Sequence, residues 1–259
     1  DVDSVIQEQK AFEKCQDVVL EYPVAENEGE EDNTYLSYNM VAGNASDSQM
    51  AMAFEVLDYA LLSAPGAPLK QALLDAKAGK DVYGSYDDGI LQPYFTVIAK
   101  GSNPDKKEEF LSVIRQVLGD IVKNGIDKKA IEAGINYFEF RYREADFSSY
   151  PKGLMYSLDI LGDWLYEQGN PFAQVQQEVF EKLKAAVNEG YFEELIRKYL
   201  LENPHGCVLT LVPKKGLAAK REKELEEKLE AYRSSLSEQE LNAMVEKTKA
   251  LEAYQEAEE

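Results

Sequence analysis

The residues with the greatest potential for chemistry lie in one stretch, NPHGCVLT at residues 203–210. It contains His205, the only histidine in 259 residues, and Cys207, one of two cysteines. In an extended segment these two side chains would lie on the same face and could both reach a metal ion. A third ligand would have to be Cys15, although the spacing does not point to such a site. We favour the structural alternative, a histidine at a helix-to-strand junction followed by a cysteine that packs in the core.

The sequence does not contain the patterns of the common catalytic sites. A zinc-peptidase helix requires two histidines on one face, in H-E-x-x-H or H-x-x-E-H order, and a single histidine cannot supply both. Phosphate-binding, dinucleotide-binding, nucleophile-elbow and EF-hand patterns are also missing, and a Ser-His-Asp triad would have to use His205. Asp87 and Asp88 could form a pair of acids, but adjacent acids before a glycine are more typical of a turn. We therefore assign no catalytic, cofactor-binding or metal-binding residue.

The charge of the chain restricts the partners that we expect. It has 48 acidic and 28 basic residues, a net charge of −20, which would repel nucleic acid and anionic membranes. The aromatic and basic stretch INYFEFRYREADF at 135–147 could suggest nucleic-acid binding, but its helical spacing and the net charge favour a core-facing helix. No apolar run approaches the roughly 18 residues needed to span a bilayer. We therefore expect neither nucleic acid nor a membrane as a partner.

The cysteines and the start of the chain bear on its compartment. Two cysteines far apart in the sequence do not make a disulfide framework, so we expect a reducing, cytoplasmic environment. The first residues show no basic segment followed by an apolar one, and no signal peptide is predicted. The chain begins with Asp rather than Met, which suggests a processed product or a fragment.

Apolar and β-branched patterns predict five strands. The first two are expected to form an antiparallel pair joined by the acidic loop at 26–32, and alternation in the second places Leu36, Tyr38 and Met40 on one face. The next two are expected to form a hairpin that turns at Asp88 and Gly89. The last is apolar on both faces, which predicts an interior position in the sheet. The predicted strands are residues 17–24, 33–43, 81–89, 90–100 and 206–213.

Helices are predicted between these strands. The clearest is residues 104–124, where apolar side chains recur three and four positions apart. Ser46 or Asp47 is expected to cap the first helix, and Asp127 to cap a later one. Pro68 suits a first helical position. The predicted helices are residues 46–63, 68–77, 104–124, one that begins at 127, 152–168, 171–188 and 191–203, with a short helix or lead-in at 1–16.

The composition changes after Pro213. Residues 217–259 contain neither Gly nor Pro and are dense in Glu, Lys, Ala and Leu. A capping-box pattern, Ser237 to Glu240, predicts that a second helix begins there. Both helices carry an apolar stripe, and such stripes require a partner because an isolated helix cannot bury them. The alternative is a solvated, charged tail.

Several strings in this order are similar to those of a known family. They are LLSAPGAPLKQALLDAKAGKDV at 61–82, QPYFTVIAKG at 92–101 and KYLLENPHGCVLTLVPKKG at 198–216, followed by LSEQELNAMVEKTKALEAYQ at 236–255. Together they resemble the second domain of the presequence-protease subfamily of pitrilysin/insulinase-type zinc peptidases, the inverzincins. The last string resembles the start of the helical linker between the two halves of those enzymes. The resemblance covers nearly the whole chain.

The resemblance implies a fold and a division of labour. The fold would be α+β, with a mostly antiparallel sheet covered by helices, of the LuxS/pitrilysin metallopeptidase type. Residues 1–215 would form the non-catalytic domain and residues 216–259 a charged helical linker element. Full-length members have four related domains around a chamber for unstructured peptides. Their H-x-x-E-H zinc helix lies in the first domain, so zinc is expected in the parent protein and in none of the residues of this chain.

We therefore expect a non-catalytic domain fragment of a zinc metalloendopeptidase, inactive alone, that walls the substrate chamber and anchors the linker. Its partners would be the other domains of the same polypeptide and unstructured peptides, and the acidic balance would favour basic ones. The alternative is a stand-alone, catalytically dead scaffold or interaction module. A third hypothesis, an enzyme with an acid-pair or His–Cys site, requires His205 to lie in a pocket.

Overall fold

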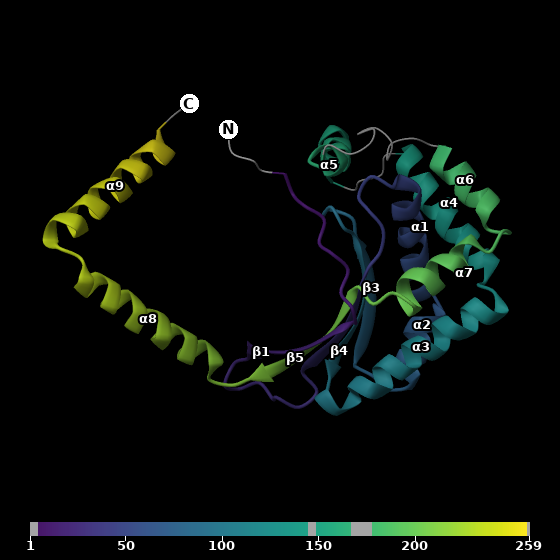
Figure 1. Ribbon diagram of the computed structural model, residues 1–259, viewed down its shortest axis with the longest axis horizontal. Helices are drawn as coiled ribbons and strands as arrows, with labels where there is room; N and C mark the ends of the chain where they lie inside the picture. The colour runs from purple at the N-terminus through teal and green to yellow at the C-terminus, as the bar shows by residue number, and fades with distance from the viewer. Residues whose placement is uncertain (1–4, 145–148, 167–177, 258–259) are drawn as a thin grey trace. The chain divides into compact units, whose positions relative to one another are not determined.

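The structure is a computed structural model that describes residues 5–144, 149–166 and 178–257 (Figure 1). The chain divides into two compact units. The larger comprises Asp1–Glu21 and Gly29–Val212, and the smaller comprises Tyr22–Glu28 and Pro213–Glu259. The larger unit contains most of the sheet and the helices that pack on it.

The sheet has five strands in the order β1-β5-β2-β4-β3. Strand β2 pairs antiparallel with both β4 and β5, and β3 pairs antiparallel with β4. This confirms the α+β class and the mostly antiparallel sheet, as well as the interior position of the last strand. The strands are β1 Gln16–Pro23, β2 Thr34–Val41, β3 Asp81–Asp87, β4 Tyr94–Ser102 and β5 Gly206–Lys214.

The predicted pairing of the first two strands is wrong, because β5 lies between β1 and β2. The ladder between β2 and β5 places Val208 opposite Tyr38, and both side chains join the main core. The hairpin of β3 and β4 is confirmed, but Asp87 pairs with Tyr94, so residues 88–93 connect the strands in place of a two-residue turn. At the start of the chain, residues 5–15 form a lead-in without a helix.

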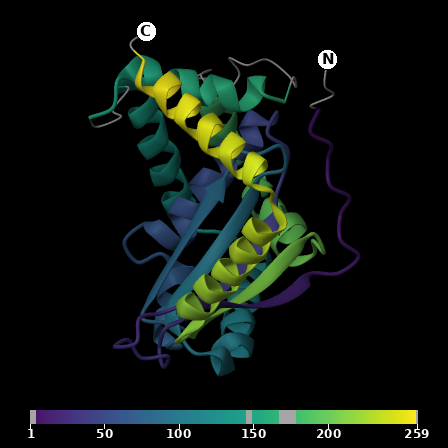
Figure 2. The same cartoon turned by 90° about the vertical axis from the view of Figure 1, so that its left-hand side faces the viewer.

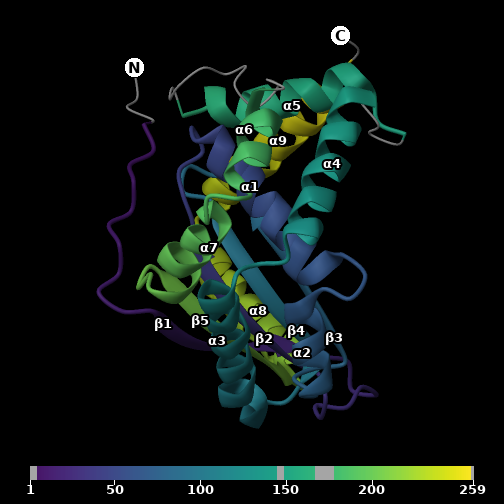
Figure 3. The ribbon, with the colours of Figure 1, turned by 90° about the vertical axis from the view of Figure 1, so that its right-hand side faces the viewer.

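The helices of the larger unit lie on one side of the sheet (Figures 1 and 3). Leu36, Tyr38 and Met40 of β2 face them and are buried, as the alternation in the sequence predicts. Phe54 and Phe110 are among the largest fully buried side chains on the helical side. The elements are α1 Ser48–Asp58, the π-helical turn η1 Tyr59–Ser63, α2 Pro68–Asp75, the 3-10 turn η2 Pro104–Lys106, α3 Lys107–Asn124, α4 Lys128–Glu144, α5 Lys152–Trp164, α6 Glu178–Ala186, α7 Tyr191–Leu195 and the π-helical turn η4 Ile196–Leu201. The predicted helix at 171–188 begins outside the described residues.

The predicted caps at Asp47 and Asp127 are confirmed, whereas the helix predicted from residue 104 begins as the 3-10 turn η2 and becomes α-helical at Lys107. The Asp47 side chain accepts a hydrogen bond from the backbone N–H of Met50 at 2.9 Å. The Asp127 side chain accepts from the N–H of Lys129 at 2.9 Å and from that of Ala130 at 3.4 Å. Each bond satisfies a donor that the first helical turn leaves without an internal partner.

Replacing Asp127 by Ala is expected to lower the free energy of unfolding by about 1 kcal/mol, because two backbone N–H groups at the start of α4 would lose their acceptor. Urea denaturation would measure the change. Asp127→Asn should retain most of the stability, since Asn caps about as well as Asp. Asp120→Ala, at an exposed position in α3, is the matched control and should cause no loss. Equal losses from both Ala variants would contradict the capping role.

The smaller unit consists mainly of two consecutive helices, α8 Leu217–Ser235 and α9 Glu238–Glu256 (Figure 2). Ser237 and Glu240 form the predicted capping box at the start of α9. Neither helix has a buried residue, and large apolar side chains such as Leu229 and Leu251 are exposed. Among the described residues, no helix combines the length and the apolar character needed to cross a bilayer.

Candidate functional site

His205 lies at the predicted junction, between the end of η4 and the start of β5. It is only 6% exposed, and its ring meets that of Phe12 edge to face, with 4.8 Å between the ring centroids. With Cys207 it borders a shallow hollow of about 420 Å³ on the surface of the larger unit. The third hypothesis, an enzyme with a His–Cys site, therefore meets its first condition.

The chemistry of this pair does not suit catalysis. Burial lowers the pKa of His205 and raises that of Cys207, so both side chains are driven toward their neutral forms. A nucleophilic cysteine requires the opposite, a thiolate stabilised by a nearby cation such as an imidazolium. Burial also raises the pKa of the second thiol, Cys15. In the described ranges, no group of three His, Cys, Asp or Glu side chains could hold a metal ion, so these residues do not fit a zinc site.

The prediction that Cys207 faces the core is wrong. Along β5, Val208 and Thr210 are buried, whereas Cys207, Leu209 and Leu211 are only half-buried. Val208 joins the main core cluster and Cys207 does not. Successive side chains in a strand point to opposite faces, so the position of Val208 on the helical side places Cys207 on the other.

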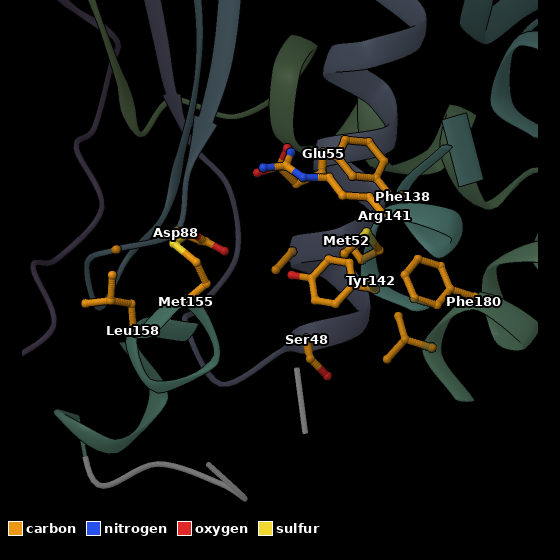
Figure 4. A pocket seen from close by; sticks show the side chains of 13 residues that line it. Ser48, Met52, Glu55, Asp88, Phe138, Arg141, Tyr142, Met155, Leu158 and Phe180 are labelled. Carbon is orange, nitrogen blue, oxygen red and sulfur yellow. The ribbon is translucent and has the colours of Figure 1, made fainter. Parts of the chain in front are cut away.

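The structure forms a different candidate site, a cavity of about 280 Å³ inside the larger unit (Figure 4). Four helices and the connection between β3 and β4 build it. Its lining combines two carboxylates and a guanidinium with thioether, aromatic and aliphatic groups. The residues are Ser48, Ala51, Met52 and Glu55 of α1, Asp88 and Gly89 of the connection, Phe138, Arg141 and Tyr142 of α4, Met155 and Leu158 of α5, and Val179 and Phe180 of α6.

Helical spacing and a close crossing of two helices place these groups together. Residues three and four positions apart share one helix face, which brings Met52 and Glu55 of α1 to the cavity. Gly134 lets α4 approach α1, because a Cβ atom there would lie 3.2 Å from Val56 Cγ1 and 3.1 Å from Tyr59 Cδ1. In Figure 4, Arg141 of α4 extends toward Glu55.

Asp88 enters the cavity because its neighbour fixes the loop. Asp87 Oδ1 accepts a hydrogen bond from the backbone N–H of Gly89 at 3.1 Å, and Asp87 Oδ2 accepts one from the Tyr94 hydroxyl at 3.1 Å. The turn interpretation of this acid pair is therefore right for Asp87. It misses Asp88, whose carboxylate points toward the cavity in Figure 4.

The cavity disfavours negative charge. Burial, followed by the charges of Asp88 and Asp58, raises the pKa of Glu55 to about 7, although Arg141 acts in the opposite direction. Burial also raises the pKa values of Asp58 and Asp88. Among the described residues that line the cavity, Arg141 is the only basic one. The site is therefore an apolar cavity with more carboxylates than cations.

Replacing Glu55 by Gln is expected to stabilise the protein at neutral and alkaline pH. Because the folded pKa of Glu55 is raised to about 7, its ionisation costs stability as the pH rises from about 4.5 to 7. The variant should exceed the wild type by on the order of 1 to 2 kcal/mol at pH 8, with the difference vanishing near pH 4. Urea denaturation across this pH range would measure it. For Glu132→Gln, at an exposed position in α4, the difference in stability from the wild type should not change with pH. A pH-independent difference for Glu55→Gln would contradict the prediction.

Comparison with known proteins identifies the family. Residues 5–138 match the model of the peptidase M16 inactive domain, and residues 211–259 match the peptidase M16-C associated region. Protein HypA of Clostridium perfringens is 42% identical over 98% of this chain and 26% of its own length. Presequence protease 1, chloroplastic/mitochondrial, of Arabidopsis thaliana is 28% identical over 98% of this chain and 24% of its own. The chain thus spans about a quarter of the length of these curated relatives.

Solved structures show the same fold at low sequence identity. The peptidase M16 inactive domain from Pseudomonas fluorescens superimposes with a TM-score of 0.50 at 15% identity, covering 80% of this chain and 46% of that one. A protease from Helicobacter pylori gives 0.54 at 14% identity, covering 77% and 44%. The chain belongs to the peptidase M16 family. Within it, the chain is the non-catalytic M16-C domain region of presequence-protease-like proteins, which confirms the predicted resemblance.

Proposed function

We propose that this region walls the peptide chamber of a presequence-protease-like peptidase and that α8 and α9 begin the linker between the halves of the enzyme. The observation that carries the proposal is the order of the two family matches, an inactive domain followed by an M16-C associated region. The exposed apolar side chains of α8 and α9 support the linker role, because such surfaces are stable in water only against a partner. The partners are the other domains of the same polypeptide and unstructured peptides.

Zinc chemistry belongs, on this proposal, to another domain of the parent protein. The described residues of this chain offer no suitable ligand set, and the raised thiol pKa values oppose metal binding further. Because Cys15 and Cys207 are free thiols, they support the proposal of a reducing, cytoplasmic compartment. A stand-alone scaffold is the second candidate. It predicts that the parent reading frame has no H-x-x-E-H helix, whereas the chamber-wall proposal predicts one upstream.

The purified 259-residue chain is expected to bind no stoichiometric zinc and to cleave no peptide. Elemental analysis after gel filtration, together with mass spectrometry of peptides incubated with the chain, would measure both. The full-length parent protein, assayed in parallel, is the positive control and should hold zinc and cleave. One tightly bound zinc per isolated chain would overturn the proposal. In the parent, His205→Ala should leave peptidase activity unchanged, since among the described residues this histidine belongs to no group that could hold a metal ion and its neighbour Cys207 is driven toward its neutral form.

A further inference from the structure

We propose that the cavity between α1, α4 and α5 binds one basic side chain of a peptide, whose neighbouring apolar residues lie on the exposed face of α5. The choice of a peptide as ligand rests on the proposed function. The preference for a cation rests on the cavity alone. These two parts are tested separately below.

The first argument compares Glu139, a glutamate outside the cavity, with Glu55 and Asp88, the two carboxylates that line it. Glu139 of α4 forms ion pairs with Arg143 and, at 2.7 Å, with Lys184, and these cations lower its pKa. In the part of the chain that the structure describes, neither Glu55 nor Asp88 forms an ion pair, and the charge of Arg141, which lowers the pKa of Glu55, is outweighed by burial and by the charges of Asp88 and Asp58. A cation that enters the cavity would therefore meet carboxylates whose charge is incompletely balanced, as charge complementarity requires.

The second argument is the size and the wall of the cavity. Its volume of about 280 Å³ lies just below the ~300–1,000 Å³ of typical small-molecule pockets, which suits one side chain better than a whole cofactor. Met52, Phe138 and Tyr142 provide thioether and aromatic surface next to the carboxylates. Lysine and arginine present the matching combination, an apolar stem and a charged head, and a guanidinium also stacks on aromatic rings.

The third argument is the outer face of α5, which continues the cavity. Leu158 lines the cavity and is still 51% exposed. Leu154, Leu161 and Trp164 lie at helical spacing around it, and Trp164 is 67% exposed. Contiguous apolar surface of this kind marks an interaction site. Because it adjoins the carboxylates, the sequence recognised would place apolar residues on either side of a basic one.

The experiment uses Trp164, the single tryptophan of the chain, as a fluorescent reporter on the 259-residue protein. The probes are acetyl-Leu-Arg-Leu-Leu-amide and the same peptide with citrulline, a neutral isostere, in place of Arg. We expect the arginine peptide to bind at least ten-fold more tightly. Glu55→Gln and Asp88→Asn should each reduce this preference to about two- or three-fold. Glu132→Gln, which removes the same charge from an exposed position in α4, should leave it intact.

Equal affinity for the two peptides would overturn the proposal, as would a preference that survives both cavity variants. Circular dichroism would verify folding, and Glu55→Gln is expected to be the more stable protein at neutral pH. If α5 instead packs against a second copy of the chain, sedimentation would show a dimer that neither peptide dissociates. That result would also overturn the proposal. If the chain binds no zinc and cleaves no peptide but also shows no preference for the arginine peptide, only the cation-binding proposal fails and the chamber-wall function stands. If the chain binds zinc, the chamber-wall function fails and the cation preference of the cavity is unaffected.

Discussion

Replacing Phe54 by Ala is expected to lower the free energy of unfolding by about 3–5 kcal/mol. Phe54 lies on α1 and is fully buried. Its ring stacks on Tyr86 with 5.1 Å between centroids, and it meets Phe95 at 6.0 Å and Tyr199 at 5.8 Å. These partners come from β3, β4 and η4, so the truncation would leave a void where several elements meet. The sheet cannot collapse to fill it without breaking its ladders.

Phe140→Ala is the matched control for this loss. The same side chain is removed from α4, but Phe140 is 63% exposed, so little packing disappears and the change should stay within about 0.5 kcal/mol. Chemical denaturation of both variants, with the slope against denaturant held constant, would measure the difference. A loss below about 1 kcal/mol for Phe54→Ala would show that α1 does not pack on the sheet as described.

Replacing Gly84 by Ala is expected to destabilise the protein by about 2–3 kcal/mol through overpacking. Gly84 lies in β3, beneath the end of α1. A Cβ atom there would overlap Leu62 Cδ1 and would lie 2.7 Å from the carbonyl oxygen of Thr96 and 2.8 Å from Asp58 Oδ1. Thr96 belongs to the neighbouring strand β4, and its backbone cannot move away without disturbing the ladder.

Gly119→Ala separates this steric effect from the general effect of removing a glycine. Gly119 lies within α3, and a Cβ atom there would meet nothing within 4 Å. Because Ala favours the helix over Gly, this variant should gain about 0.5–1 kcal/mol. The midpoint temperature of thermal unfolding should therefore fall for Gly84→Ala and rise for Gly119→Ala. A shift of the same sign in both would contradict the close approach at Gly84.

The parts of the fold that follow from local pattern could be predicted. The buried face of β2, the caps at Asp47 and Asp127, and the capping box at Ser237 each depend on residues a few positions apart. The order of the strands in the sheet could not be predicted, because the sequence of a strand does not show which distant strand it pairs with. The orientation of Cys207 was missed for a related reason: β5 is apolar at successive positions, so alternation does not show which face is buried.

The cavity could not be predicted from local sequence patterns for a different reason. Its groups come from α1, α4, α5, α6 and the β3–β4 connection, and only the packed fold brings them together. One signal was present: Glu55 is a single acid within the apolar run AMAF-VL at residues 51–57, where a charge is unusual in a buried helix. Asp88 carried no such signal, because Asp87 and Gly89 around it satisfy an ordinary turn.

The place of β5 between β1 and β2 determines when the sheet can be completed during synthesis. In the described sheet, β5 is the only neighbour of β1, although residues 16–23 leave the ribosome long before residues 206–214. Until then β1 has no strand to join, and one edge of β2 stays open to pairing with other chains. A nascent chain cut short before Gly206 would therefore leave β1 without a neighbouring strand and one edge of β2 unpaired, and it should aggregate readily.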